Sequence, residues 1–142
     1  NRIHTDFSGQ TDSQSMGQCR NSPFGSSIAF CLWLAHPIPA GRNIYVLHGH
    51  QYSVEYGLDN LAVTAENLDA DLVFFGHTHR PHWEDISGTL FFISGSCARP
   101  RGGNPPSFAV VSYPGMQDRY DVSFFGIRRE LFGKNSFYPV NV

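Results

Sequence analysis

The sequence predicts an α/β fold, and three features of residues 43–75 support this prediction. Residues 43–47 and residues 71–75 are nearly continuous runs of β-forming apolar side chains, which is typical of strands buried on both faces. Between these two runs, apolar residues recur at helical spacing. A strand, a helix and a second strand in this order indicate a parallel sheet covered by a helix.

The predicted helix has one apolar face and a polar start. Asp59 or Asn60 is positioned to cap its first turn, because short polar side chains accept hydrogen bonds from free backbone N–H groups. The apolar face consists of Leu58, Leu61, Ala62, Ala65 and Leu68.

Three further strands are predicted after the second buried strand, with no helix between them. They cover residues 89–93, 107–112 and 119–125, and the last alternates polar and apolar residues as a half-exposed strand does. A loop rich in glycine and proline spans residues 100–106, and a turn is predicted at residues 113–116. The α/β start is therefore followed by a β meander.

The two ends of the chain are less informative. Residues 1–42 form an N-terminal segment that we interpret as loop, disordered in part; within it, residues 28–35 fit either a buried strand or a short helix. Residues 128–142 form a tail without a readable pattern. The predicted domain therefore covers residues 43–127.

Composition excludes several classes of partner. Ten basic residues stand against twelve acidic ones, so the chain has no excess of positive charge to attract nucleic acid or an anionic membrane. Cys19, Cys31 and Cys97 are odd in number and form no Cys-x-x-Cys pair, which argues against a disulfide framework or a cysteine zinc site. We therefore expect a cytoplasmic protein.

Four of the seven histidines follow directly after the two buried strands. His48 and His50 follow the first strand, and His77 and His79 follow the second. On an extended segment this i, i+2 spacing directs both rings of a pair to one side, and imidazole is a common ligand of transition metals. Gly49 adjoins one pair and Gly76 the other, which leaves room for sharp turns. The alternative is that these histidines are merely hydrogen-bonded or solvated.

The other three histidines show no comparable pattern. His4 and His36 have no partner at this spacing, and His82 lies in what we interpret as a surface loop, residues 80–82.

Residues 47–50, 75–79, 94–96 and 99–108 are similar to segments of small bacterial and archaeal phosphodiesterases of the calcineurin-like metallophosphoesterase superfamily. The resemblance implies a two-sheet sandwich flanked by helices, of which this chain is the C-terminal half. It also implies a metal-dependent phosphoesterase that hydrolyses a small phosphodiester or phosphomonoester with a metal-activated water. Dimers and tetramers are common in such proteins, so homo-oligomerisation is left open.

The resemblance also implies roles for individual residues. His48 and His77 are expected to bind one metal ion and His79 another, while His50 is the catalytic side chain near the phosphate. Apart from the resemblance, Arg99 and Arg101 follow the strand predicted at residues 89–93, so Arg101 is a candidate for binding the substrate phosphate; the alternative is that both are ordinary surface arginines. Mn, Fe, Ni and Zn all suit this donor set.

The chain also departs from the pattern of these phosphodiesterases. It has no Asp-x-His, Gly-Asp or Gly-Asn motif before residue 43, and residues 93–96 read Ile-Ser-Gly-Ser where Asn-Pro-Gly-Ser is usual. We therefore expect one ion instead of the family's two, an incomplete catalytic site, and a truncated gene product or an altered reading frame upstream. Two alternatives remain: a non-catalytic scaffold of the retromer-subunit type, which residues 48–51 and 106–108 also resemble, or a non-functional fragment.

Overall fold

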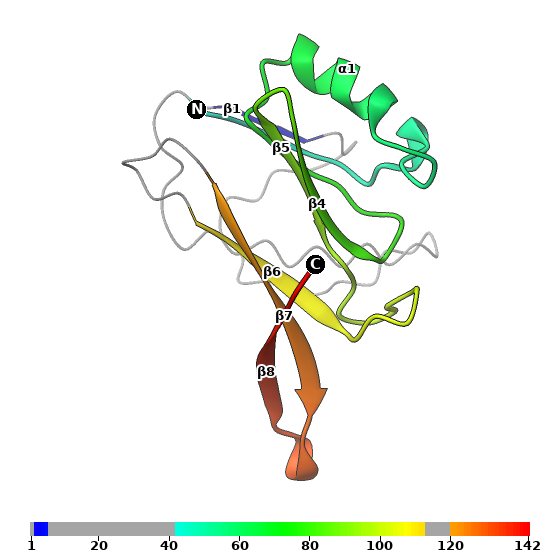
Figure 1. Cartoon of the computed structure of the whole chain (residues 1–142), viewed down its shortest axis with the longest axis vertical. Coiled ribbons are helices and arrows are strands. Elements are labelled where there is room, and N and C mark those ends of the chain that lie inside the picture. The colour runs from blue at the N-terminus through cyan, green and yellow to red at the C-terminus, as the bar shows by residue number, and fades with distance from the viewer. Residues whose placement is uncertain (1, 6–41, 113–119) are drawn as a thin grey trace.

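A computed structural model describes residues 2–5, 42–112 and 120–142 (Figure 1). The elements in chain order are β1 (Arg2–Thr5), β2 (Asn43–Val46), the 3₁₀ turn η1 (His50–Tyr52), α1 (Asp59–Asn67), β3 (Leu72–Phe74), β4 (Pro81–Ile86), β5 (Thr89–Ser94), β6 (Ser107–Ser112), β7 (Asp121–Arg129), the 3₁₀ turn η2 (Leu131–Gly133) and β8 (Asn135–Val140).

The larger sheet has the strand order β1-β2-β3-β5-β4. The first four strands in this order pair in parallel, and Tyr45, Val73 and Phe91 lie side by side across its middle. Strand β4 pairs antiparallel with β5 and forms the edge. The carboxyl ends of β2, β3 and β5 therefore lie at one border of the sheet.

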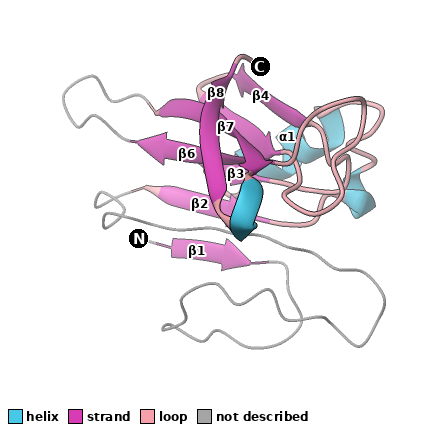
Figure 2. Cartoon of the chain, turned by 90° about the horizontal axis from the view of Figure 1, so that it is seen from below, coloured by secondary structure: helices cyan, strands magenta, loops and turns pink. Residues whose placement is uncertain are grey.

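Both faces of the central strands β2, β3 and β5 are covered, and the smaller sheet lies on one side of them (Figure 2). Tyr45 and Leu47 point into one apolar cluster, which α1 completes with Leu61 and Ala65. Ile44 and Val46 point the other way. They belong to a second cluster, against which Ala109, Val111, Tyr120 and Val122 of the smaller sheet and its entry pack.

The smaller sheet is antiparallel, with the order β6-β7-β8. The α/β prediction and the two-sheet sandwich are both confirmed. No helix in the described part of the chain is long and apolar enough to cross a membrane.

Strand β4 corrects the interpretation of residues 80–82 as a surface loop. Four of its six residues are exposed, and it begins with Pro81 and carries Glu84 and Asp85. Edge strands of this kind lack the apolar alternation by which strands are recognised in a sequence. His82 therefore lies on an exposed strand.

The ends of the chain and of α1 also differ from the predictions. β1 lies in the N-terminal segment that was interpreted as loop, β7 continues to Arg129, and the tail contains β8.

Leu58 takes the N-cap position of α1 with no side-chain hydrogen bond, so neither Asp59 nor Asn60 caps the helix. Residues 28–35 and 113–116 lie outside the described residues, and a domain covering residues 43–127 remains a prediction.

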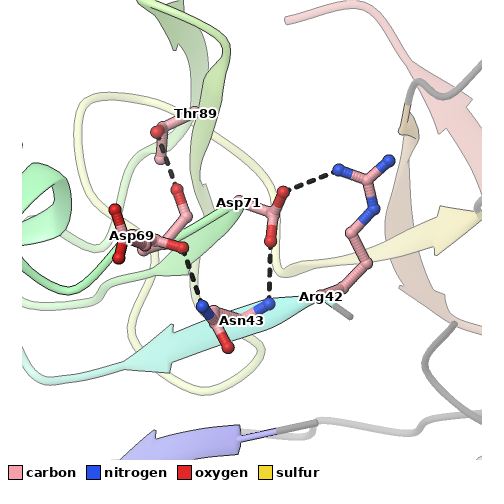
Figure 3. Close-up of polar contacts among 6 residues, drawn as sticks. Arg42, Asn43, Asp69, Asp71 and Thr89 are labelled. Atoms are coloured by element: carbon pink, nitrogen blue, oxygen red, sulfur yellow. Dashed lines mark hydrogen bonds and ion pairs between the residues drawn. The ribbon is translucent and has the colours of Figure 1, made fainter. Parts of the chain in front are cut away.

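Asp71 links the amino ends of β2 and β3, as Figure 3 shows. One carboxylate oxygen pairs with Arg42 Nη1 at 2.7 Å, and the other accepts the backbone N–H of Asn43 at 2.8 Å. The side-chain amide of Asn43 donates to the Asp69 carbonyl at 3.0 Å, and the Thr89 hydroxyl donates to the Ala70 carbonyl at 2.8 Å. These bonds fix the register at the border opposite the histidines.

We predict that Asp71→Ala destabilises the fold by about 1–3 kcal/mol, because it removes two bonds and leaves the Asn43 N–H without its acceptor. Urea unfolding followed by circular dichroism measures this change. Glu66→Ala, on the exposed surface of α1, is the control and is expected to change stability by less than about 0.5 kcal/mol. Equal effects of the two substitutions would contradict this role for Asp71.

Candidate metal centre

His48 and His77 meet because the parallel pairing of β2 and β3 continues beyond both strands. The Leu47 N–H donates to the Phe74 carbonyl at 3.0 Å, and the Gly76 N–H donates to the His48 carbonyl at 3.1 Å. The centroids of the His48 and His77 rings are consequently 5.1 Å apart, edge to face. These two predicted metal ligands therefore lie together at the carboxyl border of the sheet.

His50 joins this pair through a sharp turn at Gly49. Gly49 has a φ of 95°, and a Cβ atom built there would lie 2.9 Å from Val54 Cγ2 and 3.3 Å from the Gly76 carbonyl. Glycine is required because the backbone is left-handed and the space beside it is filled. The turn brings the His50 Nδ1 to 2.9 Å from the His48 Nδ1, so one ring donates a hydrogen bond to the other.

The backbone of the two i, i+2 histidine pairs is not extended, as the sequence suggested, but contains left-handed residues. His77 and His79 both have left-handed backbones, with φ of 80° and 58°, as does Gly49 between the first two histidines. The His79 ring turns toward the loop after β5, where its Nδ1 lies 2.8 Å from the Arg99 carbonyl oxygen.

The environment of His48 favours its neutral form. Burial, and then the neighbouring imidazoles of His50, His77 and His79, lower the pKa of His48 from 6.5 to about 4. A neutral imidazole retains a lone pair, and transition metals bind that form.

Glu55 is a residue that the sequence analysis did not single out. Its Oε2 atom lies 3.6 Å from the His77 Nε2, and both side chains are partly exposed. Glu55 follows η1 in the same turn that carries His50. A carboxylate a few residues after the first His pair is the sequence feature by which it could have been identified as a neighbour of the cluster. His82 lies instead beside Glu84 on β4, with 3.5 Å between its Nε2 and the carboxylate.

The donor types in this cluster fit a divalent transition metal, but their present arrangement is not a finished site. Within the residues that the structure describes, no three His, Cys, Asp or Glu side chains are arranged to hold an ion. His48 and His50 use their Nδ1 atoms on each other, and His79 bonds through its Nδ1 to the Arg99 carbonyl, which leaves Nε2 as the atom of the His79 ring that can bind an ion.

Arg101 lies on the loop that contacts His79. Its backbone N–H donates to the His79 carbonyl at 3.2 Å, and the residue is exposed. Cys97, on the same loop, has a free thiol of intermediate exposure.

Comparison with protein families and with curated proteins finds similarity to phosphoesterases in both cases. Residues 9–115 match the calcineurin-like phosphoesterase superfamily domain. The chain is 37% identical over 71 residues to the probable metallophosphoesterase YsnB of Bacillus subtilis, covering 50% of this chain and 42% of YsnB. It is 33% identical over 70 residues to the phosphodiesterase YfcE of Escherichia coli K12, covering 49% of this chain and 34% of YfcE. The chain thus spans less than half the length of these curated relatives.

A solved structure supports the fold. Vps29 of Chaetomium thermophilum superposes with a TM-score of 0.52 at 23% identity, covering 70% of this chain and 52% of Vps29. At this identity the likeness concerns the arrangement of the strands and the helix.

We predict that Gly49→Ala destabilises the protein by about 1–3 kcal/mol more than Gly88→Ala does, as measured by urea unfolding. The two glycines have similar φ values of 95° and 89°, but a Cβ at Gly88 would meet nothing within 4 Å. Gly88→Ala therefore reports backbone strain alone, and the difference reports the crowding by Val54 and Gly76. Equal costs would show that this crowding does not hold the turn.

Proposed function

Because the chain belongs to the calcineurin-like phosphoesterase superfamily, we propose that its histidine cluster is the remaining part of a metal-dependent phosphoesterase site. The observation that carries the proposal is the convergence of His48, His50 and His77 at the carboxyl border of the sheet, with ring centroids 5.0–6.3 Å apart. Such borders are where α/β sheets place ligands and catalytic groups.

In this proposal His48, His77 and His79 hold a divalent ion, one of Mn, Fe, Ni or Zn. The lowered pKa of His48 keeps that ring neutral at pH 7 and available as a donor. Glu55 adds a carboxylate on the side of His77. An ion bound there would act as a Lewis acid, supplying an activated water and offsetting negative charge on the phosphoryl oxygens.

His50 and Arg101 are proposed to act on the substrate. His50 is exposed and shares a hydrogen bond with His48, so its ring is placed to exchange a proton or to donate to a phosphate oxygen. Arg101 lies on the loop bonded to His79, and a guanidinium pairs well with phosphate oxygens. Neither role requires a net positive charge on the whole chain, whose formal net charge is -2.

We propose a small phosphate ester as the substrate and a cytoplasmic location. The printed names of YsnB and YfcE, a probable metallophosphoesterase and a phosphodiesterase, favour this substrate class. The acidic balance of the chain does not favour nucleic acid or an anionic membrane as a partner. Homo-oligomerisation remains open in this proposal.

A non-catalytic binding module is the second candidate, and exposed apolar side chains favour it. Leu131 and Phe132, in the turn between β7 and β8, are 83% and 99% exposed, and Phe137 on β8 is 60% exposed. Apolar side chains gathered on a surface are typical of sites that bind other proteins. The hairpin β7–β8 extends away from the larger sheet in Figure 1.

We predict that the chain binds manganese and that His77→Asn weakens this binding by more than about 100-fold, since ligand loss should exceed the cost of losing an outer partner. Hydrolysis of bis-p-nitrophenyl phosphate tests whether the remaining site also supports chemistry. Asparagine tolerates the left-handed backbone of His77, so the substitution tests the ligand and not the turn. Release of p-nitrophenol and metal content after dialysis are the two measurements.

His82→Asn is the matched control, because His82 lies on exposed β4 and pairs with Glu84. It should leave both measurements unchanged. Metal uptake without hydrolysis would support the ligand set and show that the site is incomplete for chemistry. Absence of metal uptake would contradict the proposal and favour the binding module.

A further inference from the structure

His79 differs from the other histidines of the cluster in how its ring is held. Its Nδ1 lies 2.8 Å from the Arg99 carbonyl oxygen. A carbonyl oxygen only accepts hydrogen bonds, so the His79 Nδ1 carries the proton and donates it. The remaining lone pair of the neutral ring therefore lies on Nε2, which becomes the atom able to bind a metal.

The other rings are not fixed in this way. His48 and His50 share a bond between two Nδ1 atoms, which either ring can donate. The His77 Nε2 is 3.6 Å from the Glu55 carboxylate, longer than a good hydrogen bond. Within the described part of the cluster, His79 is thus the histidine whose tautomer is set by a backbone oxygen.

The Arg99 carbonyl is itself positioned by Ser96. The Arg99 N–H donates to the Ser96 hydroxyl oxygen at 2.9 Å, which closes a short turn at the start of the loop. The same loop bonds back to the histidine segment, because the Arg101 N–H donates to the His79 carbonyl at 3.2 Å. His79 is therefore held on its ring side and on its backbone side by neighbouring residues of one loop.

Further bonds hold this loop to the sheet. The Ser107 hydroxyl donates to the Ser94 carbonyl at 2.8 Å, and the Ser107 N–H donates to the Ser96 carbonyl at 3.1 Å. The Asn104 side chain donates to the Arg101 carbonyl at 2.8 Å. Because these bonds anchor the rest of the loop, loss of the Ser96 hydroxyl should free mainly the turn that carries the Arg99 carbonyl.

We propose that Ser96 is a positioning residue that, through the Arg99 carbonyl, fixes His79 in the Nδ1–H tautomer and so makes Nε2 the atom of this ring that can bind a metal ion. This inference rests on the proposed function for its consequence, but the tautomer is a property of the metal-free chain. Carbonyl or carboxylate partners of this kind orient metal-binding imidazoles and raise their basicity.

The test is a comparison of Ser96→Ala with two controls by long-range ¹H–¹⁵N NMR on the metal-free full chain. This measurement distinguishes the protonated ring nitrogen from the unprotonated one. We expect His79 to be Nδ1–H in the unsubstituted chain and a mixture of tautomers in Ser96→Ala. Ser96→Thr keeps the hydroxyl and should restore the single tautomer.

The controls separate this role from a general effect on the loop. Ser94→Ala removes a hydroxyl that makes no hydrogen bond within the described residues, and Arg99→Ala keeps the backbone carbonyl. Both should retain the Nδ1–H tautomer. Zinc titrated by calorimetry should bind about 10–100-fold more weakly to Ser96→Ala than to the unsubstituted chain or to Ser94→Ala.

An unchanged His79 tautomer in Ser96→Ala would overturn the proposal, and so would an equal change in Ser94→Ala. A chain that neither binds zinc nor hydrolyses esters would refute the proposed function, while the tautomer measurement would still decide the role of Ser96.

Discussion

The parallel pairing of β2, β3 and β5, buried on both faces, determines where the rest of the described chain lies. Helix α1 covers one face and the smaller sheet covers the other, so the strands have no freedom to slip without exposing one of two apolar clusters. Asp71 strengthens this constraint at the amino border. At the opposite border the backbone bonds run on past the strands and bring His48 beside Gly76. The cluster of histidines is thus a consequence of the register.

The buried strands and the helix were predictable from the sequence because their apolar patterns are strong. The larger sheet follows from residues 43–47 and 71–75, and the convergence of His48 with His77 follows from parallel pairing. Strand β4 was missed because its exposed residues carry no such pattern, and β1 and β8 lie in segments without a clear signal. Local composition is a poor guide where a strand is stabilised mainly by its neighbour.

The finer geometry of the cluster was beyond the sequence for a different reason. The positive φ values of His77 and His79 are unusual for residues other than glycine, and the segment that carries them is bonded to distant parts of the chain through Gly76 and His79. The Arg99 carbonyl is a backbone group, so its role as the hydrogen-bond acceptor for His79 cannot be predicted from the type of residue at position 99. Glu55 reaches His77 only because Gly49 and η1 turn the chain back. Such features depend on tertiary contacts, and spacing along the chain does not encode them.

Strand β4 affects whether copies of the chain can associate through the edge of the larger sheet. It forms one edge of the larger sheet, starts with a proline that has no N–H to offer, and exposes the negative charges of Glu84 and Asp85. A foreign strand that approached this edge would find fewer backbone partners and a repulsive charge if it were itself acidic. Uncontrolled growth of the sheet into fibrous aggregates is therefore disfavoured on this side, where the main exposed apolar side chain of β4 is Trp83, which is 47% exposed.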